Sequence, residues 1–266
     1  MEFTQKEHKE IYKDNFTEYL LCLALDVGEG MLKNGAEIYR VENTIERICR
    51  AYGAVHVECF GIISFIHAAV RMPDGEYSTQ MRRVRSTTVN LHALEAFNAL
   101  SREICRTTPP LCEFDARIRQ AKGTRSYSRP VRMLASGITT GAFCLFFGGT
   151  AVDALIATLI GLLVFGIESH SSLRINPLIK TLFSSVIITL LVGAAMRLGL
   201  GHNADAMISG SIMILVPGVA FCSAMQDLLG GDLLAGSLKT VQAALCALMI
   251  GFGYVLGGAL IGGAFV

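Results

Sequence analysis

The chain has 266 residues, a net charge of +1 and 17% charged residues, a balance that averages two unlike halves. Residues 1–132 hold 19 Lys/Arg and 17 Asp/Glu, whereas residues 133–266 hold only 4 and 5. The near-neutral first half lacks the basic stripe of a nucleic-acid partner, and the eight cysteines contain no CxxC pair that would favour a disulfide framework or a zinc site. We therefore expect a polar first half, a membrane-embedded second half, no nucleic acid, no metal and no cofactor.

The first half predicts four helices and a small sheet. Apolar residues at steps of three and four over 20–52 predict an amphipathic helix, which Asn34-Gly35 divides in two. The β-branched and aromatic stretches over 54–84 predict a three-stranded antiparallel meander, with bends near Gly61 and at 73–76. Helical spacing returns over 88–106, and a short polar helix then ends at Gly123. We predict a compact α+β cytoplasmic N-terminal domain over residues 1–127.

One polar motif of this domain lies around the turn between its first two helices: Asn34, Gly35, Glu37, Arg40 and Glu42. Glu37 and Arg40 stand three positions apart, a spacing more typical of an ion pair than of a catalytic dyad. The sequence contains no nucleophile elbow, phosphate-binding glycine loop or HExxH motif. We therefore predict no catalytic residue.

The second half contains five uncharged stretches, at 133–152, 154–167, 181–196, 206–226 and 240–266. A spanning helix needs about 20 mostly apolar residues. We predict an all-α polytopic membrane domain of about five transmembrane helices over residues 128–266, in contact with membrane lipid. The second stretch is short, so a re-entrant segment is the alternative there. Arg125, Arg129 and Arg132 precede the first stretch, which places the N-terminus in the cytoplasm by the positive-inside rule.

The fourth stretch, read as "GSIMILVPGVAFCSAMQDLLGGD" over 210–232, is interrupted by Pro217-Gly218. Proline lacks the amide donor that a helix needs, and unsatisfied backbone is costly in lipid. Transporters use such interrupted helices to hold polar solutes, although a plain proline kink is the other interpretation. If the break serves transport, we predict that the substrate pathway consists of Ser209, Ser211, Pro217, Gly218, Ser223 and Gln226.

Three titratable residues of the second half are candidates for proton coupling. Asp227 closely follows an apolar helix, and Glu168 and His170 end the second stretch. Anchoring at the membrane interface is the alternative role for Glu168 and His170. For the nearby Asp232, capping of the next helix is the better interpretation.

The last stretch carries two small-residue pairs, Gly253/Gly257 and Gly258/Gly262. Glycines four residues apart let helix backbones approach closely in lipid. The spacing leaves open whether the neighbouring helix belongs to this chain or to another.

Three segments together resemble the threonine/serine exporter family of bacterial membrane proteins: "LLCLALDVGEGMLKNGAEIYRVENTIERICRAYG" (20–53), "RVRSTTVNLHALEAFNALSREI" (83–104) and "GSIMILVPGVAFCSAMQDLLGGDLLAGSLKT" (210–240). The resemblance implies a cytoplasmic domain followed by five spans in the bacterial inner membrane. It also implies export of small hydrophilic metabolites driven by the proton gradient, and so a transporter rather than an enzyme.

The chain is similar to the split form of that family, in which a second, smaller membrane subunit supplies the other half. That form is associated with export of dicarboxylates such as succinate, whereas the family name implies threonine and serine. Assembly with the smaller subunit, with further copies of the chain, or with both, is therefore expected. Two other functions stay open at this point: a membrane-anchored hydrolase, and a regulatory or sensor protein acting through the N-terminal domain.

Overall fold

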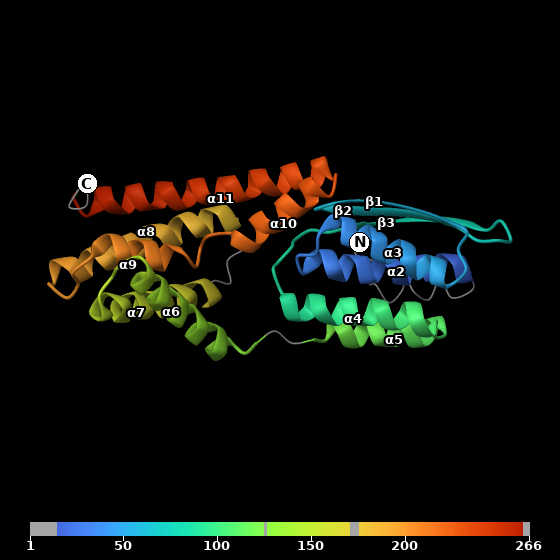
Figure 1. Cartoon of the computed structure of the whole chain (residues 1–266), viewed down its shortest axis with the longest axis horizontal. Helices are drawn as coiled ribbons and strands as arrows, with labels where there is room; N and C mark the ends of the chain where they lie inside the picture. Colours follow the sequence, from blue (N-terminus) through green and yellow to red (C-terminus); the bar gives the residue numbers. More distant parts are fainter. Residues whose placement is uncertain (1–14, 125–126, 171–175, 263–266) are drawn as a thin grey trace. The chain divides into compact units, whose positions relative to one another are not determined.

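The computed structural model describes residues 15–124, 127–170 and 176–262, apart from the side chain of His170. Within these ranges the chain forms ten helices and one three-stranded sheet (Figure 1). It divides into two compact units. The first contains the residues before 127 together with Val219–Thr240, and the second contains Tyr127–Gly218 and the residues from Val241 onward.

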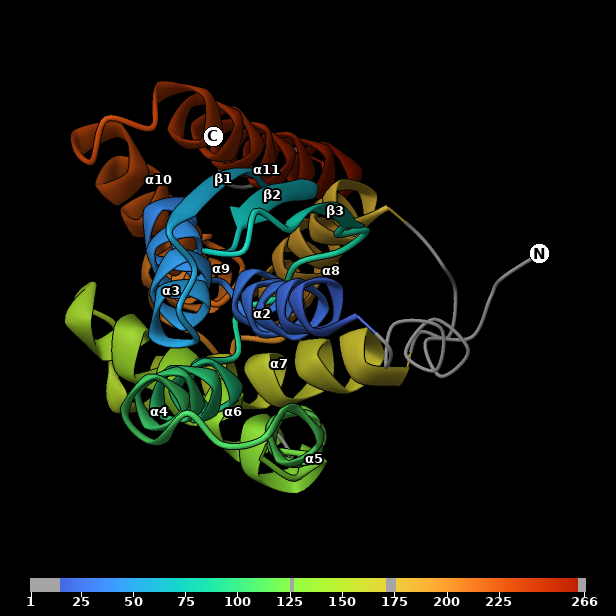
Figure 2. The same cartoon turned by 90° about the vertical axis from the view of Figure 1, so that its right-hand side faces the viewer.

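The first unit has three layers (Figures 1 and 2). The sheet is one layer, the first two helices form the middle layer, and the next two helices form the third. In chain order these elements are α2 (Phe16–Lys33), α3 (Ile38–Ala51), β1 (His56–Ile62), β2 (Phe65–Arg71), β3 (Tyr77–Arg83), α4 (Leu91–Thr107) and α5 (Leu111–Lys122). Helix α10 (Gly218–Leu229) and the first residues of α11 (Leu233–Leu260) complete the unit.

Helix α2 is the centre of this unit. Its residues are buried almost all round, as expected for a helix with layers on both sides. Two glycines permit close packing: a Cβ at Gly28 would lie 2.6 Å from the Ile45 side chain, and one at Gly30 would lie 2.3 Å from the ring of Phe97. The helix is therefore continuous through both glycines and ends at Asn34-Gly35, where Gly35 has a φ of +95°. The predicted division into two helices at this turn is confirmed.

The predicted antiparallel meander is present, with β2 between β1 and β3. The first bend, predicted near Gly61, lies at residues 63–64, and Gly61 itself belongs to β1 and pairs with Ile66. The second bend covers 72–76 and uses Gly75 at a φ of +89°.

The second unit is helical throughout its described residues. It contains α6 (Arg129–Phe146), α7 (Ala151–His170), α8 (Pro177–Arg197), α9 (Ala204–Ile212) and the remainder of α11. Small residues bring α6 and α7 together: a Cβ at Gly141 would lie 3.0 Å from the carbonyl oxygen of Ala154, and one at Gly161 would meet Thr140 at 2.3 Å. Such close backbone approach is typical of helices packed in lipid.

The glycine pair Gly253/Gly257 packs within the chain. A Cβ at Gly253 would lie 2.6 Å from the carbonyl oxygen of Leu182 in α8, and one at Gly257 would lie 2.6 Å from Thr189. Ser185 of α8 also donates a hydrogen bond to the carbonyl of Ile250 at 2.8 Å. The partner of this pair is therefore α8.

The predicted fold class is wrong. It placed an α+β domain before a separate all-α membrane domain of about five transmembrane helices. Both units are mainly helical, and the sheet has only three strands. The first unit is also not the N-terminal half alone, since it includes Val219–Thr240 and has Ala235 in its core. The division at residue 127 between a cytoplasmic domain (1–127) and a membrane domain (128–266) stays a prediction.

Three helices among the described residues, rather than five, are long and apolar enough to cross a membrane: Ala151–Ser169, Pro177–Arg197 and Leu233–Leu260. Two of the predicted spans fail for different reasons. Helix α6 begins with Arg129, includes Arg132 and carries several hydroxyl side chains, which lower its apolar character. The stretch over 206–226 is divided into α9, of 9 residues, and α10, of 12.

Candidate functional site

The interruption of the fourth apolar stretch lies between α9 and α10. Helix α9 ends at Ile212, and residues 213–217 are not helical. The segment is held by short turns, in which the amide of Leu215 donates to Ile212 at 2.8 Å and that of Gly218 donates to Val216 at 2.8 Å. Pro217 has no amide to donate, so the ladder of helical hydrogen bonds stops here. The interruption that Pro217-Gly218 predicts is thus a complete break between two helices.

The predicted pathway residues fall on both sides of this break. On α9, Ser209 is exposed, whereas Ser211 is 1% exposed and its Oγ has no hydrogen-bond partner among the described residues. On α10, Ser223 is buried and Gln226 is exposed. A buried hydroxyl without a partner is costly, so Ser211 is a position where a polar ligand or water would be stabilised.

Asp227 is the centre of a buried polar cluster in the first unit. Its Oδ2 lies 2.5 Å from the Nζ of Lys239, and this side chain is 0% exposed while that of Lys239 is 13% exposed. Lys239 also donates to the Oγ of Ser223 at 3.0 Å. Ser223 and Asp227 are one turn apart on α10, so both face α11. Of the predicted pathway and coupling residues, the structure brings Ser223 and Asp227 together.

The other carboxylate oxygen of Asp227 binds the start of α3. Its Oδ1 accepts a hydrogen bond from the amide of Ile38 at 3.1 Å. The first amides of a helix have no partner within that helix, and Glu37 at the N-cap makes no side-chain cap bond. Asp227 therefore supplies a capping acceptor from a residue 189 positions away, and its negative charge is favourable at a helix N-terminus.

Two further carboxylates lie in the same region. Glu42 of α3 accepts a hydrogen bond from the amide of Gly61 at 2.6 Å. Burial raises the pKa of Glu42, and the negative charges of Asp232 and Asp227 raise it further, whereas the bond from Gly61 opposes this change. Burial and the charge of Asp227 likewise raise the pKa of Asp232. Asp227 and Asp232 thus both interact with the ammonium group of Lys239, while Glu42 feels the negative charges of these two aspartates, and protonation is favoured at Glu42 and Asp232.

A tight turn between α10 and α11 brings Asp227 close to Lys239. Gly231 has a φ of +93°, and the amide of Asp232 donates to the carbonyl of Asp227 at 2.9 Å. Asp232 in turn accepts a hydrogen bond from the amide of Ala235 in the first turn of α11, which agrees with the predicted capping role.

The N-terminal motif contributes to this cluster through its backbone and Glu42. Glu37 and Arg40 form the expected ion pair, at 3.8 Å. Asn34 uses its Nδ2 to donate to the carbonyl of Gly30 at 2.7 Å and ends α2. The motif therefore builds the turn that presents the amide of Ile38 to Asp227.

The second predicted pair of titratable residues lies in the second unit. Glu168 accepts a hydrogen bond from Ser184 of α8 at 2.8 Å, and Lys180 donates to the backbone carbonyl of Glu168 at 2.7 Å. The side chain of His170 lies outside the described residues, so its pairing with Glu168 stays a prediction. The contacts of Glu168 connect α7 to α8.

Two important residues were missed from the sequence. Lys239, which no sequence motif singled out, is the ion-pair partner of Asp227. Asp153, also not singled out, is 0% exposed and accepts hydrogen bonds from Thr150, His202 and Asn203. The only sequence signal for either was that charges are rare in this half of the chain. In the parts of the chain that the structure describes, no group of three His, Cys, Asp or Glu residues is placed to hold a metal ion.

Comparison with known families matches residues 22–261 to the family described as "Putative threonine/serine exporter". Two similar proteins are each named "Probable succinate transporter subunit YjjP". The one from Klebsiella aerogenes is 25% identical over 85% of this chain and 88% of its own length, and the one from Escherichia coli is 23% identical over 88% and 91%. The "Pheromone-regulated membrane protein 10" of Debaryomyces hansenii is 23% identical over 88% of this chain but only 24% of its own length. No solved structure matches the chain.

Proposed function

The chain belongs to the threonine/serine exporter family, and from this premise we propose that it is one subunit of an exporter that moves small hydrophilic metabolites across the bacterial inner membrane. The observation that carries the proposal is the family match over nearly the whole chain, 22–261. Three helices able to span a bilayer identify the chain as a membrane protein. We further propose that its N-terminus lies in the cytoplasm.

Succinate is the first candidate solute. The two bacterial relatives named as succinate transporter subunits have nearly the length of this chain, since the matches cover 88% and 91% of them. Their names support a dicarboxylate, whereas the family description supports threonine or serine. All three solutes are small and polar, and each needs hydrogen-bonding groups in place of water as it crosses the membrane.

Those groups, in this proposal, lie around the break at residues 213–217. The freed backbone there and the unpartnered hydroxyl of Ser211 offer hydrogen bonds to a polar solute. Protonation of Asp227 would remove its ion pair with Lys239 and free α10 from that partner, which supports Asp227 as a residue of proton coupling. Glu168 and His170 are proposed as a second titratable pair in that process.

A partner subunit completes the proposed exporter. The relatives are named as subunits, which supports an assembly of more than one chain. We propose a second, smaller membrane protein of the same family as the partner, with further copies of this chain as the alternative.

Efflux from cells of the source organism tests the proposal, because any partner is then present. Cells with and without the gene are loaded with labelled succinate, threonine or serine, and loss of label is followed with time. We expect the deletion to slow efflux of one of the three, and the wild-type gene to restore it. A protonophore should abolish the gene-dependent part if the proton gradient drives export. Equal efflux of all three solutes from both strains would disprove the proposed function.

A further inference from the structure

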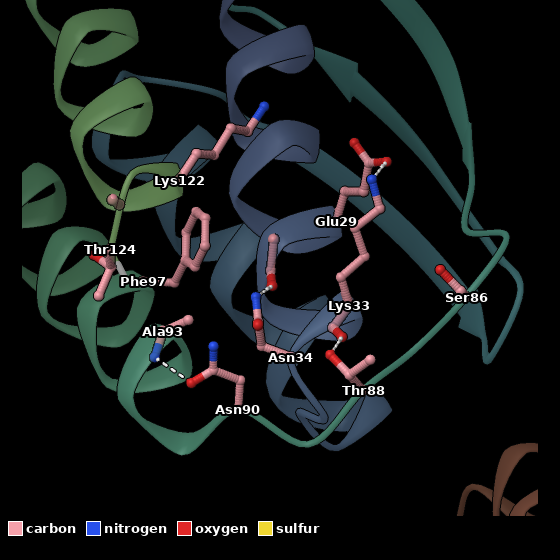
Figure 3. A pocket seen from close by; sticks show the side chains of 12 residues that line it. Glu29, Lys33, Asn34, Ser86, Thr88, Asn90, Ala93, Phe97, Lys122 and Thr124 are labelled. Atoms are coloured by element: carbon pink, nitrogen blue, oxygen red, sulfur yellow. Dashed lines mark hydrogen bonds and ion pairs between the residues drawn. The ribbon is translucent and has the colours of Figure 1, made fainter. Parts of the chain in front are cut away.

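A polar pocket of about 390 Å³ lies in the first unit, and its lining includes none of the residues assigned to the substrate pathway or to proton coupling (Figure 3). It is formed by the end of α2, the segment 84–90, the start of α4 and the end of α5. Its lining consists of Glu29, Gly30, Lys33, Asn34, Ser86, Thr88, Asn90, Ala93, Phe97, Ala121, Lys122 and Thr124. Pockets for small metabolites begin at about 300 Å³, so the volume is sufficient.

The walls of the pocket are fixed by backbone hydrogen bonds. The amide of Thr88 donates to the carbonyl of Lys33 at 2.8 Å, and that of Asn90 donates to Asn34 at 3.2 Å. Asn90 also caps α4 by accepting from the amide of Ala93 at 3.2 Å. The irregular segment 84–90 is therefore held against α2 and α4, and the pocket is preformed.

The floor of the pocket is the ring of Phe97, which is 2% exposed. In Figure 3 the ring lies in the middle of the group, with Lys122 above it and Asn90 below. The ring lies close to α2 only because residue 30 is glycine. A small ligand would thus have an apolar surface beneath it and polar groups around its edge.

The charged side chains that line the pocket, Glu29, Lys33 and Lys122, sum to one positive charge. Glu29 and Lys33 neutralise each other at 2.6 Å. Lys122 lies 3.2 Å from Asp26, a carboxylate outside the lining that Arg82 also approaches at 3.6 Å. The excess charge favours an anion near Lys122.

Neutral hydrogen-bonding groups complete the site. Asn34 donates with Nδ2 to Gly30 and so presents its Oδ1 as an acceptor, while Ser86, Thr88 and Thr124 bring hydroxyl groups. We infer that this pocket binds a small carboxylate metabolite, whose carboxylate pairs with Lys122 and whose remaining polar groups bind the hydroxyl and amide side chains. The inference concerns binding to the first unit and does not depend on export.

Titration of the purified full chain in detergent tests this inference, with succinate and L-threonine as separate probes. Isothermal calorimetry should detect saturable binding of at least one probe. Replacement Lys122→Gln should weaken that binding about tenfold or more, because it removes a charge-assisted hydrogen bond. Lys122→Arg keeps the charge and should keep most of the affinity.

The matched control is Arg119→Gln, which removes one positive charge from the same helix. Arg119 pairs with Asp115 at 2.8 Å and does not line the pocket, so its replacement should leave affinity unchanged. Amide hydrogen exchange locates the bound probe. A probe bound in the pocket should slow exchange in residues 84–92, whereas a solute bound only on the transport path would protect other segments. Absence of binding by both probes, equal loss from Lys122→Gln and Arg119→Gln, or no protection of 84–92 would overturn the inference.

Discussion

At the scale of single residues, the ion pair of Asp227 and Lys239 joins two helices through a buried contact. Both side chains are removed from water, one of them completely. A buried pair adds little net stability compared with apolar residues, but the loss of one partner leaves an uncompensated charge. The second oxygen of Asp227 also caps α3. The residue therefore fixes α10, α11 and α3 together within the first unit.

The replacement Asp227→Asn should destabilise the protein by about 3 kcal/mol, because it breaks the buried ion pair with Lys239. Thermal unfolding in detergent, followed by circular dichroism, measures the change. The double replacement Asp227→Asn with Lys239→Met should be more stable than Asp227→Asn alone, since the ammonium group that lost its buried partner is removed as well.

The control for this experiment is Asp205→Asn. Asp205 lies exposed in the first turn of α9, so its replacement should change stability by no more than about 0.5 kcal/mol. Equal effects of Asp227→Asn and Asp205→Asn would show that the ion pair contributes nothing specific.

We expect Glu42 to make the stability of the first unit depend on pH. Its folded-state pKa lies above the ordinary value of 4.5, because of burial and the neighbouring acids. A carboxyl whose pKa is raised by folding costs no stability below its unfolded pKa, and its ionisation opposes folding as pH rises above that value. The replacement Glu42→Gln keeps an acceptor for Gly61 and should raise stability at pH 7 relative to wild type.

Unfolding midpoints of wild type and Glu42→Gln, compared from pH 4.5 to 8, measure this effect. The advantage of Glu42→Gln should be smallest at the acid end and grow toward neutral pH. A difference that stays constant with pH, or that shrinks toward neutral pH, would contradict the assigned direction of the pKa.

At the scale of elements, small residues determine how the helices of the second unit pack. Among the described residues of this unit, the closest approach to the backbone of another helix is at Gly210 of α9, where a Cβ would lie 2.5 Å from the backbone nitrogen of Cys144 in α6. Backbone cannot move aside as a flexible side chain can. The contact between α6 and α9, just before the break, therefore requires glycine.

The replacement Gly210→Ala should lower stability by about 2 kcal/mol, since it forces α9 away from α6. Gly166→Ala is the matched control, because Gly166 is helical and no described heavy atom lies within 4 Å of its Cβ position. Gly166→Ala should change the free energy of unfolding by no more than about 1 kcal/mol, in the stabilising direction, because alanine favours a helix more than glycine does. Thermal unfolding of both variants in the same detergent measures the contrast, and equal destabilisation by the two would refute the packing argument.

Elements with strong local signals were predictable from the sequence. The Asn34-Gly35 turn and the antiparallel meander of β1 to β3 depend on neighbouring residues, and both are present as predicted. The number of spans was not predictable from uncharged length alone, because the break at residues 213–217 divides one apolar stretch into two helices, of 9 and 12 residues. The assignment of α10 to the first unit depends on contacts between residues such as Asp227 and Ile38, which are 189 positions apart.

At the scale of the whole molecule, α11 is longer than the hydrocarbon core of a bilayer is thick. Its 28 residues extend about 42 Å, whereas the hydrocarbon core is about 30 Å thick. The excess corresponds to about eight residues, the length of the part that belongs to the first unit, Leu233–Thr240. We therefore expect Lys239, and with it the cluster around Asp227, to lie outside the hydrocarbon core.

The sequence revealed the candidate site only in part, because the site depends on contacts between residues that are far apart in the chain. Asp227 stood out because acids are rare in an apolar segment. Its partners did not, since Lys239 and Glu42 carry no special spacing relative to it. The side-chain cluster arises from tertiary packing of three helices, which no local pattern encodes.

The central claim is that export depends on the break at Pro217 and on the cluster around Asp227. The most direct measurement is gene-dependent efflux of the responsive solute from loaded cells that express wild type, Asp227→Asn, Pro217→Ala or Asp205→Asn at equal membrane levels. The account predicts that Asp227→Asn and Pro217→Ala each lower the efflux rate about tenfold or more, the equivalent of 1.4 kcal/mol, while Asp205→Asn keeps the wild-type rate. Wild-type efflux from both Asp227→Asn and Pro217→Ala would contradict it.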